Sequence, residues 1–190
     1  MEDDNSTLPD LLRQDLDIVF VGINPSIFSV NQGHYFARRT NRFWPAFSRS
    51  KLSLTARQGL GIEMLQPHHD RVLLEYGFGF TDAVKRASAR ATEITPAEFA
   101  AGVETLVAKL ESLTPRIACF HGIMAYRQVH RALTATKTDP ELGLQNLSIG
   151  KTGLFLAPNP SPANAHFTPS EQTLWYDRLA ECLTTAKLNC

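Results

Sequence analysis

The sequence predicts a single α/β domain of three layers, in which a mainly parallel central sheet carries helices on both faces. Three short apolar runs, at 18–21, 117–120 and 152–157, have the length and residue types of buried strands. Helical segments alternate with these runs along the chain, and such alternation is typical of a parallel sheet. The length of 190 residues fits one domain of this kind.

Composition narrows the class of protein further. The chain is 43% hydrophobic, which suits an ordinary core, and no apolar run approaches the ~20 residues of a membrane span. Its first residues are acidic where a secretion signal would be basic, so we expect a cytoplasmic or nuclear protein with no membrane partner. Cys119, Cys182 and Cys190 are odd in number and far apart, which argues against disulfides, zinc and iron–sulfur clusters. We therefore expect no metal and no cofactor.

The charges sum to zero but are unevenly distributed. Residues 1–17 hold six acidic residues and one basic residue, which leaves 18 basic and 13 acidic residues, a net charge of +5, in the rest of the chain. No acidic residue lies between Ile18 and Ile62, whereas six basic residues do. A run of this kind is as typical of a solvated face as of a nucleic-acid contact, and its position after the first candidate site loop favours the second. We expect residues 1–16 to be an acidic, mobile segment and residues 17–190 to form the domain.

The first strand leads into the loop around which we expect the site to be organised. Gly22 permits a sharp turn at the strand end, and ligands of open α/β sheets bind beyond the carboxyl ends of the strands. Pro25 stiffens the loop, and Ser26 can cap a following helix so that backbone N–H groups point into the crevice. Asn24 is therefore expected on a rigid loop that is rich in hydrogen-bond donors.

Aromatic residues follow on a polar segment at 31–40. Tyr35 and Phe36 either fold onto the core, which is the commoner fate, or one of them is a platform on which a planar base stacks, worth ~1–3 kcal/mol per base. A helix is expected after Thr40 or Asn41, with Trp44 in the core.

A short helix is expected at 67–76. Its His68, His69 and Asp70 are adjacent in the sequence, and neighbours on a helix do not face one metal ion together, so we discount a metal site. A second glycine-rich corner then ends in Asp82.

The rest of the chain supplies the remaining layers. A capping box at 95–98 begins a helix whose apolar residues recur at helical spacing. The strand at 117–120 ends at His121, which is either catalytic or, more commonly, a hydrogen-bonded structural histidine. Residues 134–146 are expected to be a loop. The last strand delivers Asn159 to the same edge of the sheet as Asn24.

Three loops, at 22–26, 79–86 and 158–166, are thus expected to converge. They contain no Ser-His-Asp set, no phosphate loop with a lysine and no dinucleotide fingerprint, but two amides and one carboxylate. This set suits the splitting of a base from its sugar, in which a site stabilises a cation-like sugar, holds one water and accepts negative charge on the base.

Each residue type fits one of these tasks. Asp82 can stabilise the sugar cation and Asn24 can position the water, although an amide cannot act as a base. Backbone N–H groups near Ile23, together with Asn159, can meet the oxygens of the base. Asp82 has an equally plausible structural role as a helix cap or as a partner of Lys85 or Arg86.

The same motifs carry a family resemblance. GINPS (22–26), GHYFARRTNRFW (33–44), GFTDAVKR (79–86) and NPSPANAH (159–166) resemble the ordered motifs of the mismatch-specific uracil and thymine DNA glycosylases, within the uracil-DNA glycosylase superfamily. The resemblance spans roughly residues 17–185. It implies a monofunctional, monomeric DNA repair glycosylase that flips uracil, notably uracil opposite guanine, out of double-stranded DNA without a cofactor.

The resemblance also implies roles for individual residues. The asparagine that matches Asn24 positions water, and Phe36 matches the stacking residue. Many members lack a carboxylate at the place of Asp82. The motif NPSPANAH also resembles HPSPLSAH of the uracil-specific enzymes, with Asn159 in place of the catalytic histidine, and Ser161 would pinch a phosphate.

Relatives end this last motif with a bulky wedge that fills the gap left by the flipped base, whereas this chain has only small side chains there. The residues expected to contact DNA are Ser26, Arg38, Arg39, Lys85, Arg86, Ser161, Pro162, Ala163 and Asn164. Two alternative functions remain: a non-catalytic nucleotide- or DNA-binding module that uses the same crevice, and a small hydrolase acting on free nucleosides.

Overall fold

A computed structural model describes residues 7–164 and 166–188. Five strands form one sheet in the order β2-β1-β3-β5-β4. They are β1 (Ile18–Gly22), β2 (Phe78–Asp82), β3 (Ile117–His121), β4 (Gly143–Ile149) and β5 (Thr152–Ala157). Strands β2, β1, β3 and β5 are parallel, and β4 pairs antiparallel with β5 at one edge. The single domain and the mainly parallel sheet confirm the predicted fold class.

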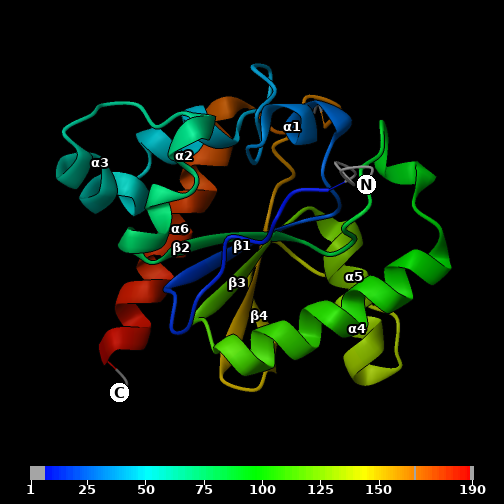
Figure 1. Ribbon diagram of the computed structural model, residues 1–190. Coiled ribbons are helices and arrows are strands. Elements are labelled where there is room, and N and C mark those ends of the chain that lie inside the picture. Colours follow the sequence, from blue (N-terminus) through cyan, green and yellow to red (C-terminus); the bar gives the residue numbers. More distant parts are fainter. Residues whose placement is uncertain (1–6, 165, 189–190) are drawn as a thin grey trace.

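Helices cover both faces of this sheet (Figure 1). They are α1 (Ile27–Gln32), α2 (Phe43–Arg49), α3 (Leu54–Leu60), α4 (Pro96–Leu113), α5 (Ile123–Thr134) and α6 (Pro169–Leu188). In Figure 1, α2, α3 and α6 lie on one side of the strands, and α4 and α5 lie on the other. Of the helices in the described part of the chain, none is both long enough and apolar enough to cross a membrane.

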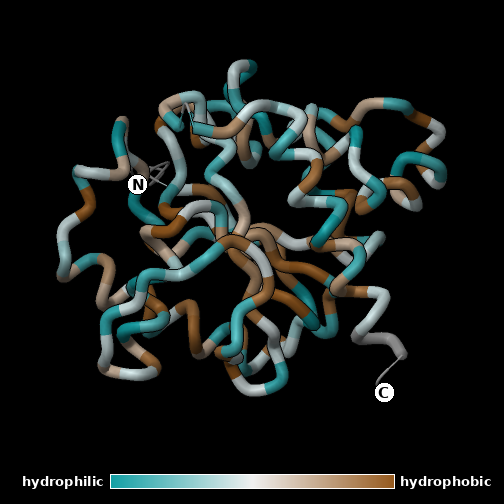
Figure 2. Tube along the Cα trace, turned by 180° about the vertical axis from the view of Figure 1, so that it is seen from behind, coloured by the Kyte–Doolittle hydropathy of each residue, from teal (hydrophilic) through white to brown (hydrophobic). Residues whose placement is uncertain are grey.

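The alternation of side chains along the strands builds two cores. Phe20 of β1 packs with Phe43 and Tyr176 on the α2 and α6 side, whereas Val19 and Val21 pack with residues of α4 and α5. Successive side chains of a strand point to opposite faces, so an apolar run such as 18–21 is buried on both. The hydrophobic residues accordingly concentrate in the central strands when the chain is viewed from behind (Figure 2).

Two segments differ from the predicted elements. The edge strand β4 begins at Gly143, inside the segment 134–146 that was expected to be a loop, and its side chains up to Ser148 are exposed or half-exposed, without the apolar run that marks a buried strand. Residues 67–76 form two short 3₁₀ turns, not one helix.

The N-terminal segment also differs from the expectation of a mobile tail. Leu8 and Leu16 are buried, and the backbone of Leu11 exchanges two hydrogen bonds of 2.9 Å with Phe80. The carboxylate of Asp10 accepts hydrogen bonds from Lys85, Lys109 and Thr81. Residues 8–16 are thus part of the packed domain, and the prediction for residues 1–6 lies outside the described residues.

Candidate active site

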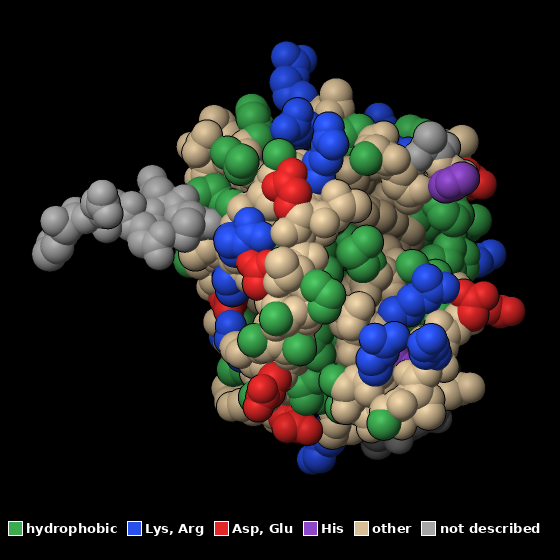
Figure 3. Space-filling model, turned by 90° about the vertical axis from the view of Figure 1, so that its right-hand side faces the viewer, with side chains coloured by type: hydrophobic (Ala, Val, Ile, Leu, Met, Phe, Trp, Pro, Cys, Tyr) green, Lys and Arg blue, Asp and Glu red, His purple; other side chains and the backbone are tan. Residues whose placement is uncertain are grey.

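A cavity of about 400 Å³ lies where β1, β2, β3 and β5 end. Strands β1 and β2 run toward the right-hand side of Figure 1, and Figure 3 shows that side of the molecule, with basic side chains projecting at its upper margin and hydrophobic ones across its middle. The three loops expected to converge all contribute lining residues. The predicted site residues that line the cavity are Ile23, Asn24, Ser26, Phe36, Arg38, Asp82, Asn159, Ser161, Pro162 and Ala163.

The amide of Asn24 has a fixed orientation in this cavity. Its Nδ2 donates to the carbonyl oxygens of Arg86, at 3.0 Å, and Pro25, at 3.2 Å, and to Ser88 Oγ at 2.8 Å. A carbonyl can only accept, so the nitrogen of the amide must face these partners. Oδ1 accepts no hydrogen bond from the described residues, and it is left to accept one from a molecule in the cavity.

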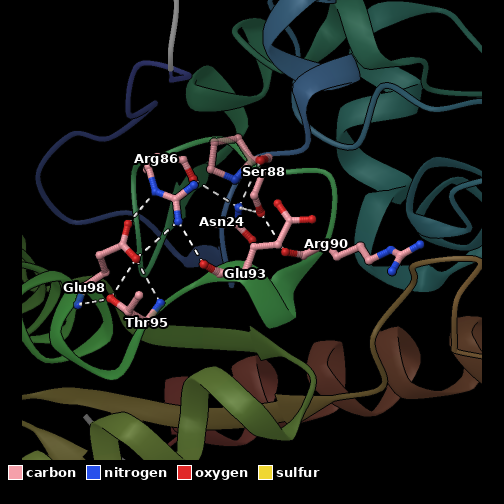
Figure 4. Close-up of polar contacts among 8 residues, drawn as sticks. Asn24, Arg86, Ser88, Arg90, Glu93, Thr95 and Glu98 are labelled. Carbon is pink, nitrogen blue, oxygen red and sulfur yellow. Dashed lines mark hydrogen bonds and ion pairs between the residues drawn. The ribbon is translucent and has the colours of Figure 1, made fainter.

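The loop that follows β2 holds this amide in place (Figure 4). Ser88 is buried and donates its own hydroxyl proton to the carbonyl of Arg90 at 2.8 Å, so toward Asn24 it acts as an acceptor. The Arg86 guanidinium binds the Glu98 carboxylate and donates to the Glu93 carbonyl at 3.0 Å. The hydrogen bond from Arg86 lowers the pKa of Glu98 to about 2, so this ion pair persists at neutral pH.

Lys85 and Arg86, which were expected to contact DNA, form ion pairs within the chain. Lys85 Nζ lies 2.8 Å from Asp10 Oδ1 and is partly buried, and the Arg86 guanidinium is held by Glu98. Both cations already have carboxylate partners within the chain. The two side chains therefore fasten the N-terminal segment and the loop after β2, and neither lines the cavity.

Asp82 ends β2 with a buried carboxyl group that lines the cavity. It is 6% exposed, and Oδ2 has no hydrogen-bond partner among the residues described. Its pKa is raised to about 7, chiefly by burial, with Lys85 opposing the shift and the charge of Asp10 adding to it. Neither structural alternative considered for Asp82 is present, because it caps no helix and because Lys85 and Arg86 pair with other carboxylates.

Gly22 makes room for this carboxyl group. A Cβ at Gly22 would lie 2.2 Å from Asp82 Oδ1, well inside van der Waals contact. Because β1 and β2 are parallel and adjacent, Gly22 and Asp82 are direct neighbours in the register. The glycine of the GINPS motif is therefore required by the carboxylate, whereas its φ, which is not positive, does not itself require glycine.

Phe36 lines the cavity, and its backbone has a conformation that residues other than glycine rarely adopt. Its φ is +53°, and its ring stacks on Phe43 with centroids 4.4 Å apart. Hydrogen bonds pin the preceding residue, since the N–H of Tyr35 donates to Asp70 and its carbonyl accepts from Trp44 Nε1 at 2.9 Å. A strained backbone that the surroundings hold in place is a common feature of functional sites. Tyr35 and Trp44 themselves belong to the core.

Asn159 follows β5 and presents its amide nitrogen. Its Oδ1 accepts from the N–H of Ser161 at 2.9 Å, and its carbonyl accepts from Asn164 Nδ2 at 2.9 Å. The Nδ2 group donates no hydrogen bond to other described residues, so it remains a donor for a ligand. Ile23 differs, because its side chain packs on the apolar clusters of the α4 side and leaves its backbone to the cavity.

Arg42 holds the loop that carries Asn159. Its guanidinium donates to the carbonyl oxygens of Ser161, at 2.7 Å, and of Asn164 and Phe167, while its backbone N–H donates to the Pro160 carbonyl at 3.0 Å. Arg42, one base of the stretch between Ile18 and Ile62, therefore binds groups of the protein itself. Pro162 and Ala163 remain exposed at the rim of the cavity.

His121 was expected to be either catalytic or a hydrogen-bonded structural histidine, and the structure shows the hydrogen bond. It is 2% exposed, its Nε2 lies 2.9 Å from the Tyr176 hydroxyl, and its ring stacks on Phe20. Burial lowers its pKa to about 3, so the ring is neutral at physiological pH. His121 adds a neutral wall to the cavity.

Two other basic residues of the stretch between Ile18 and Ile62 are exposed to solvent. Arg38 and Arg39 are exposed, and Arg38 lines the cavity with its guanidinium 5.4 Å from the ring centroid of Phe28. Ser26 caps α1 as expected, since its Oγ accepts from the N–H of Ser29 at 3.1 Å. No group of three His, Cys, Asp or Glu side chains within residues 7–164 and 166–188 is placed to hold a metal ion.

Sequence reasoning missed two residues that shape the site. Ser88 belongs to no motif that predicts its hydrogen bond with Asn24, because the pairing depends on how the loop after β2 folds back. Arg42 counted only as one base of the stretch between Ile18 and Ile62, and nothing in that pattern indicates that its guanidinium donates to carbonyl groups of the loop after β5. Both depend on partners that are distant in the sequence and are brought close only by folding.

Comparisons with known proteins bear on the family and the fold. The family model of the uracil DNA glycosylase superfamily matches residues 9–180. Among solved structures, the fold resembles the solution NMR structure of a proposed uracil DNA glycosylase from Methanosarcina acetivorans, with a TM-score of 0.54 and 17% sequence identity. That similarity covers 93% of this chain and 98% of the other.

Proposed function

The chain belongs to the uracil DNA glycosylase superfamily, and from this premise we propose that it hydrolyses the N-glycosidic bond of deoxyuridine in double-stranded DNA, notably of uracil opposite guanine, and leaves an abasic site. One observation carries the proposal. The oriented amide of Asn24 and the unpaired carboxyl of Asp82 line one cavity at the carboxyl edge of the sheet.

The two groups complement the charges that develop as the bond breaks. The sugar becomes cation-like, and a carboxylate at Asp82 stabilises that charge more in the transition state than in the ground state. Asn24 Oδ1 accepts a hydrogen bond from the attacking water and directs its oxygen toward the sugar. With a pKa of about 7, Asp82 can also receive the proton that the water releases.

Other groups that line the cavity suit the departing base. Asn159 Nδ2 and the backbone at Ile23 can donate to the oxygens of the pyrimidine as it takes up negative charge. Phe36, which is stacked on Phe43, offers a planar surface to the flipped base. Related damaged pyrimidines with similar leaving groups are further substrates in this proposal.

The lining also favours hydrolysis over a covalent route. A glycosylase that also cuts the strand forms a Schiff base through an amine. Among the described residues, no lysine lines this cavity, and Lys85 is paired with Asp10. We therefore propose a monofunctional enzyme, and one chain suffices because all of these groups come from one domain.

Base release from defined duplexes tests the proposal. Labelled duplexes that contain one uracil, thymine, hypoxanthine or ethenocytosine opposite guanine are incubated with the protein, and abasic sites are then cleaved with alkali. We expect cleavage at uracil that requires the alkali step. A protein that binds such duplexes but releases no base would be the binding module, and one that acts only on deoxyuridine would be the nucleoside hydrolase.

A further inference from the structure

Two neighbouring apolar side chains at the start of α1 are exposed beside the cavity. Ile27 is 50% exposed and Phe28 is 38% exposed, whereas the next residue of the helix, Ser29, is buried and lines the cavity. Single exposed hydrophobic residues are common on protein surfaces. Here the two are consecutive, and they directly follow the loop that holds Asn24.

The structure holds this apolar pair in a fixed position. The helix is capped at one end by Ser26 and at the other by Gly33, whose φ of +70° allows the backbone to turn back onto the last turn. Arg38 reaches back from the next loop and places its guanidinium over the Phe28 ring. An aromatic ring that is supported in this way loses little side-chain freedom on binding.

The charge around the pair matches a nucleic acid. Arg38 and Arg39 are exposed, and no acidic residue occurs between Ile18 and Ile62. Figure 3 shows Lys and Arg side chains and exposed hydrophobic side chains on the same side of the molecule. An apolar tip flanked by cations suits a duplex, in which an apolar side chain can enter the base stack while the cations neutralise phosphates.

The other rim of the cavity lacks a group that can do this. Pro162 and Ala163 are exposed, but their side chains are too small to fill the space that a flipped nucleotide leaves. Unstacking a base carries a free-energy cost that an inserted apolar side chain offsets. If uracil is to enter the cavity from a duplex, that side chain has to come from elsewhere on the rim.

We propose that Phe28, supported by Arg38, is the wedge that enters the DNA duplex and stabilises the flipped state of the nucleotide. This inference rests on the proposed function. It assigns to α1 a task that the small side chains of the 159–164 loop cannot perform, and it makes double-stranded DNA the partner of the exposed apolar pair.

The test compares duplexes in which flipping is more or less costly. Single-turnover release of uracil is measured for uracil opposite guanine and for uracil opposite an abasic site, where no pair has to be broken. We expect Phe28→Ala to slow release opposite guanine about tenfold and release opposite the abasic site by less than about twofold, because only in the first does a base pair have to be broken as well as the uracil unstacked. Phe28→Leu should recover much of the loss.

A matched variant controls for the removal of an exposed apolar group. Leu54→Ala, at the start of α3, removes a side chain that is 45% exposed on the part of the molecule farthest from the site face in Figure 1, and it should leave both rates unchanged. A 2-aminopurine beside the uracil should brighten on binding of the wild type and less with Phe28→Ala.

The possible outcomes separate the wedge from the glycosylase itself. Equal slowing of both substrates, or wild-type rates for Phe28→Ala, would overturn the wedge and leave the glycosylase standing. Absence of uracil release by the wild-type protein from either duplex would instead overturn the proposed function.

Discussion

At the scale of single residues, the carboxyl group of Asp82 is the part of the site that responds to pH. Its raised pKa of about 7 means that the native state binds a proton more readily than the unfolded chain, whose value is near 3.8. The stabilising contribution is fully present below the unfolded value and is lost as the pH rises through about 7. At alkaline pH the protein therefore keeps a buried charge that destabilises the fold.

Replacing Asp82 by Asn should raise the stability of the protein at alkaline pH and lower its activity. Asp82→Asn keeps the shape of the side chain and removes the charge, so the variant should be more stable than the wild type at pH 8, by on the order of 2 kcal/mol, and about equal to it at pH 4. Its rate of base release should be low at every pH, whereas the wild-type rate should rise through about pH 7. Urea unfolding and single-turnover rates at several pH values measure both effects. A stability difference that does not change with pH would show that the Asp82 pKa is not raised.

At the scale of elements, the loop between β2 and α4 decides how Asn24 functions. Asn24 has three hydrogen bonds to that loop and its own neighbour, and the Arg86–Glu98 ion pair fastens the loop to the first turn of α4. The capping box at Thr95 and Glu98 was evident from the sequence and is confirmed. Its carboxylate serves two purposes, because it caps the helix and also binds Arg86.

Removing one hydroxyl from this loop should affect the reaction without affecting binding. Ser88→Ala deletes the acceptor at 2.8 Å from Asn24 Nδ2, so the amide can rotate and place its oxygen poorly. We expect the single-turnover rate to fall about tenfold while the affinity for uracil-containing duplex stays the same. Ser48→Ala is the control, because Ser48 is also a buried serine, its hydroxyl donates to the Trp44 carbonyl, and it does not line the cavity. Equal slowing by both variants would indicate a general loss of packing.

Some of these elements could be predicted from the sequence and others could not. Strong periodicity and caps predicted α4, β1 and β3, because an apolar run buried on both faces and a capping box are local signals. The first residues of the edge strand β4 alternate between half-exposed and exposed and have little apolar character, so their pairing with β5 could only be seen in the fold. The tertiary pairing of Asp10 with Lys85 and Lys109 likewise joins residues that no local pattern relates.

At the scale of the whole molecule, the distribution of charge matters more than its sum. Of the basic residues predicted to contact DNA, Lys85 and Arg86 form ion pairs with carboxylates of the same chain, whereas Arg38 and Arg39 are exposed. Arg42, another base of the stretch between Ile18 and Ile62, donates to backbone carbonyl groups. The convergence of Asn24, Asp82 and Asn159 on one cavity could be predicted, since the carboxyl ends of parallel strands meet at one edge. Which cations remain free could not be predicted, because that depends on carboxylates and carbonyls brought close by folding.

Arg38 and Arg39 should set the salt dependence of DNA binding. Joint replacement of Arg38 and Arg39 by Ala should weaken binding to all duplex sequences alike and should lower the slope of log affinity against log salt by about 2. Arg71→Ala with Lys151→Ala removes two exposed bases that precede β2 and β5, at the opposite edge of the sheet, and should leave the slope unchanged. A slope that is unaffected by the Arg38 and Arg39 changes would return these residues to an ordinary solvated face.

The central claim is that Asn24 directs a water onto the sugar of a uracil nucleotide held in this cavity, and release of free uracil measures it most directly. In single-turnover reactions with a duplex containing uracil opposite guanine, the wild-type protein should release uracil, and Asn24→Ala should do so about a hundredfold more slowly while folding and binding the duplex as before. Release of uracil at the same rate by both proteins, or by neither, would contradict the account.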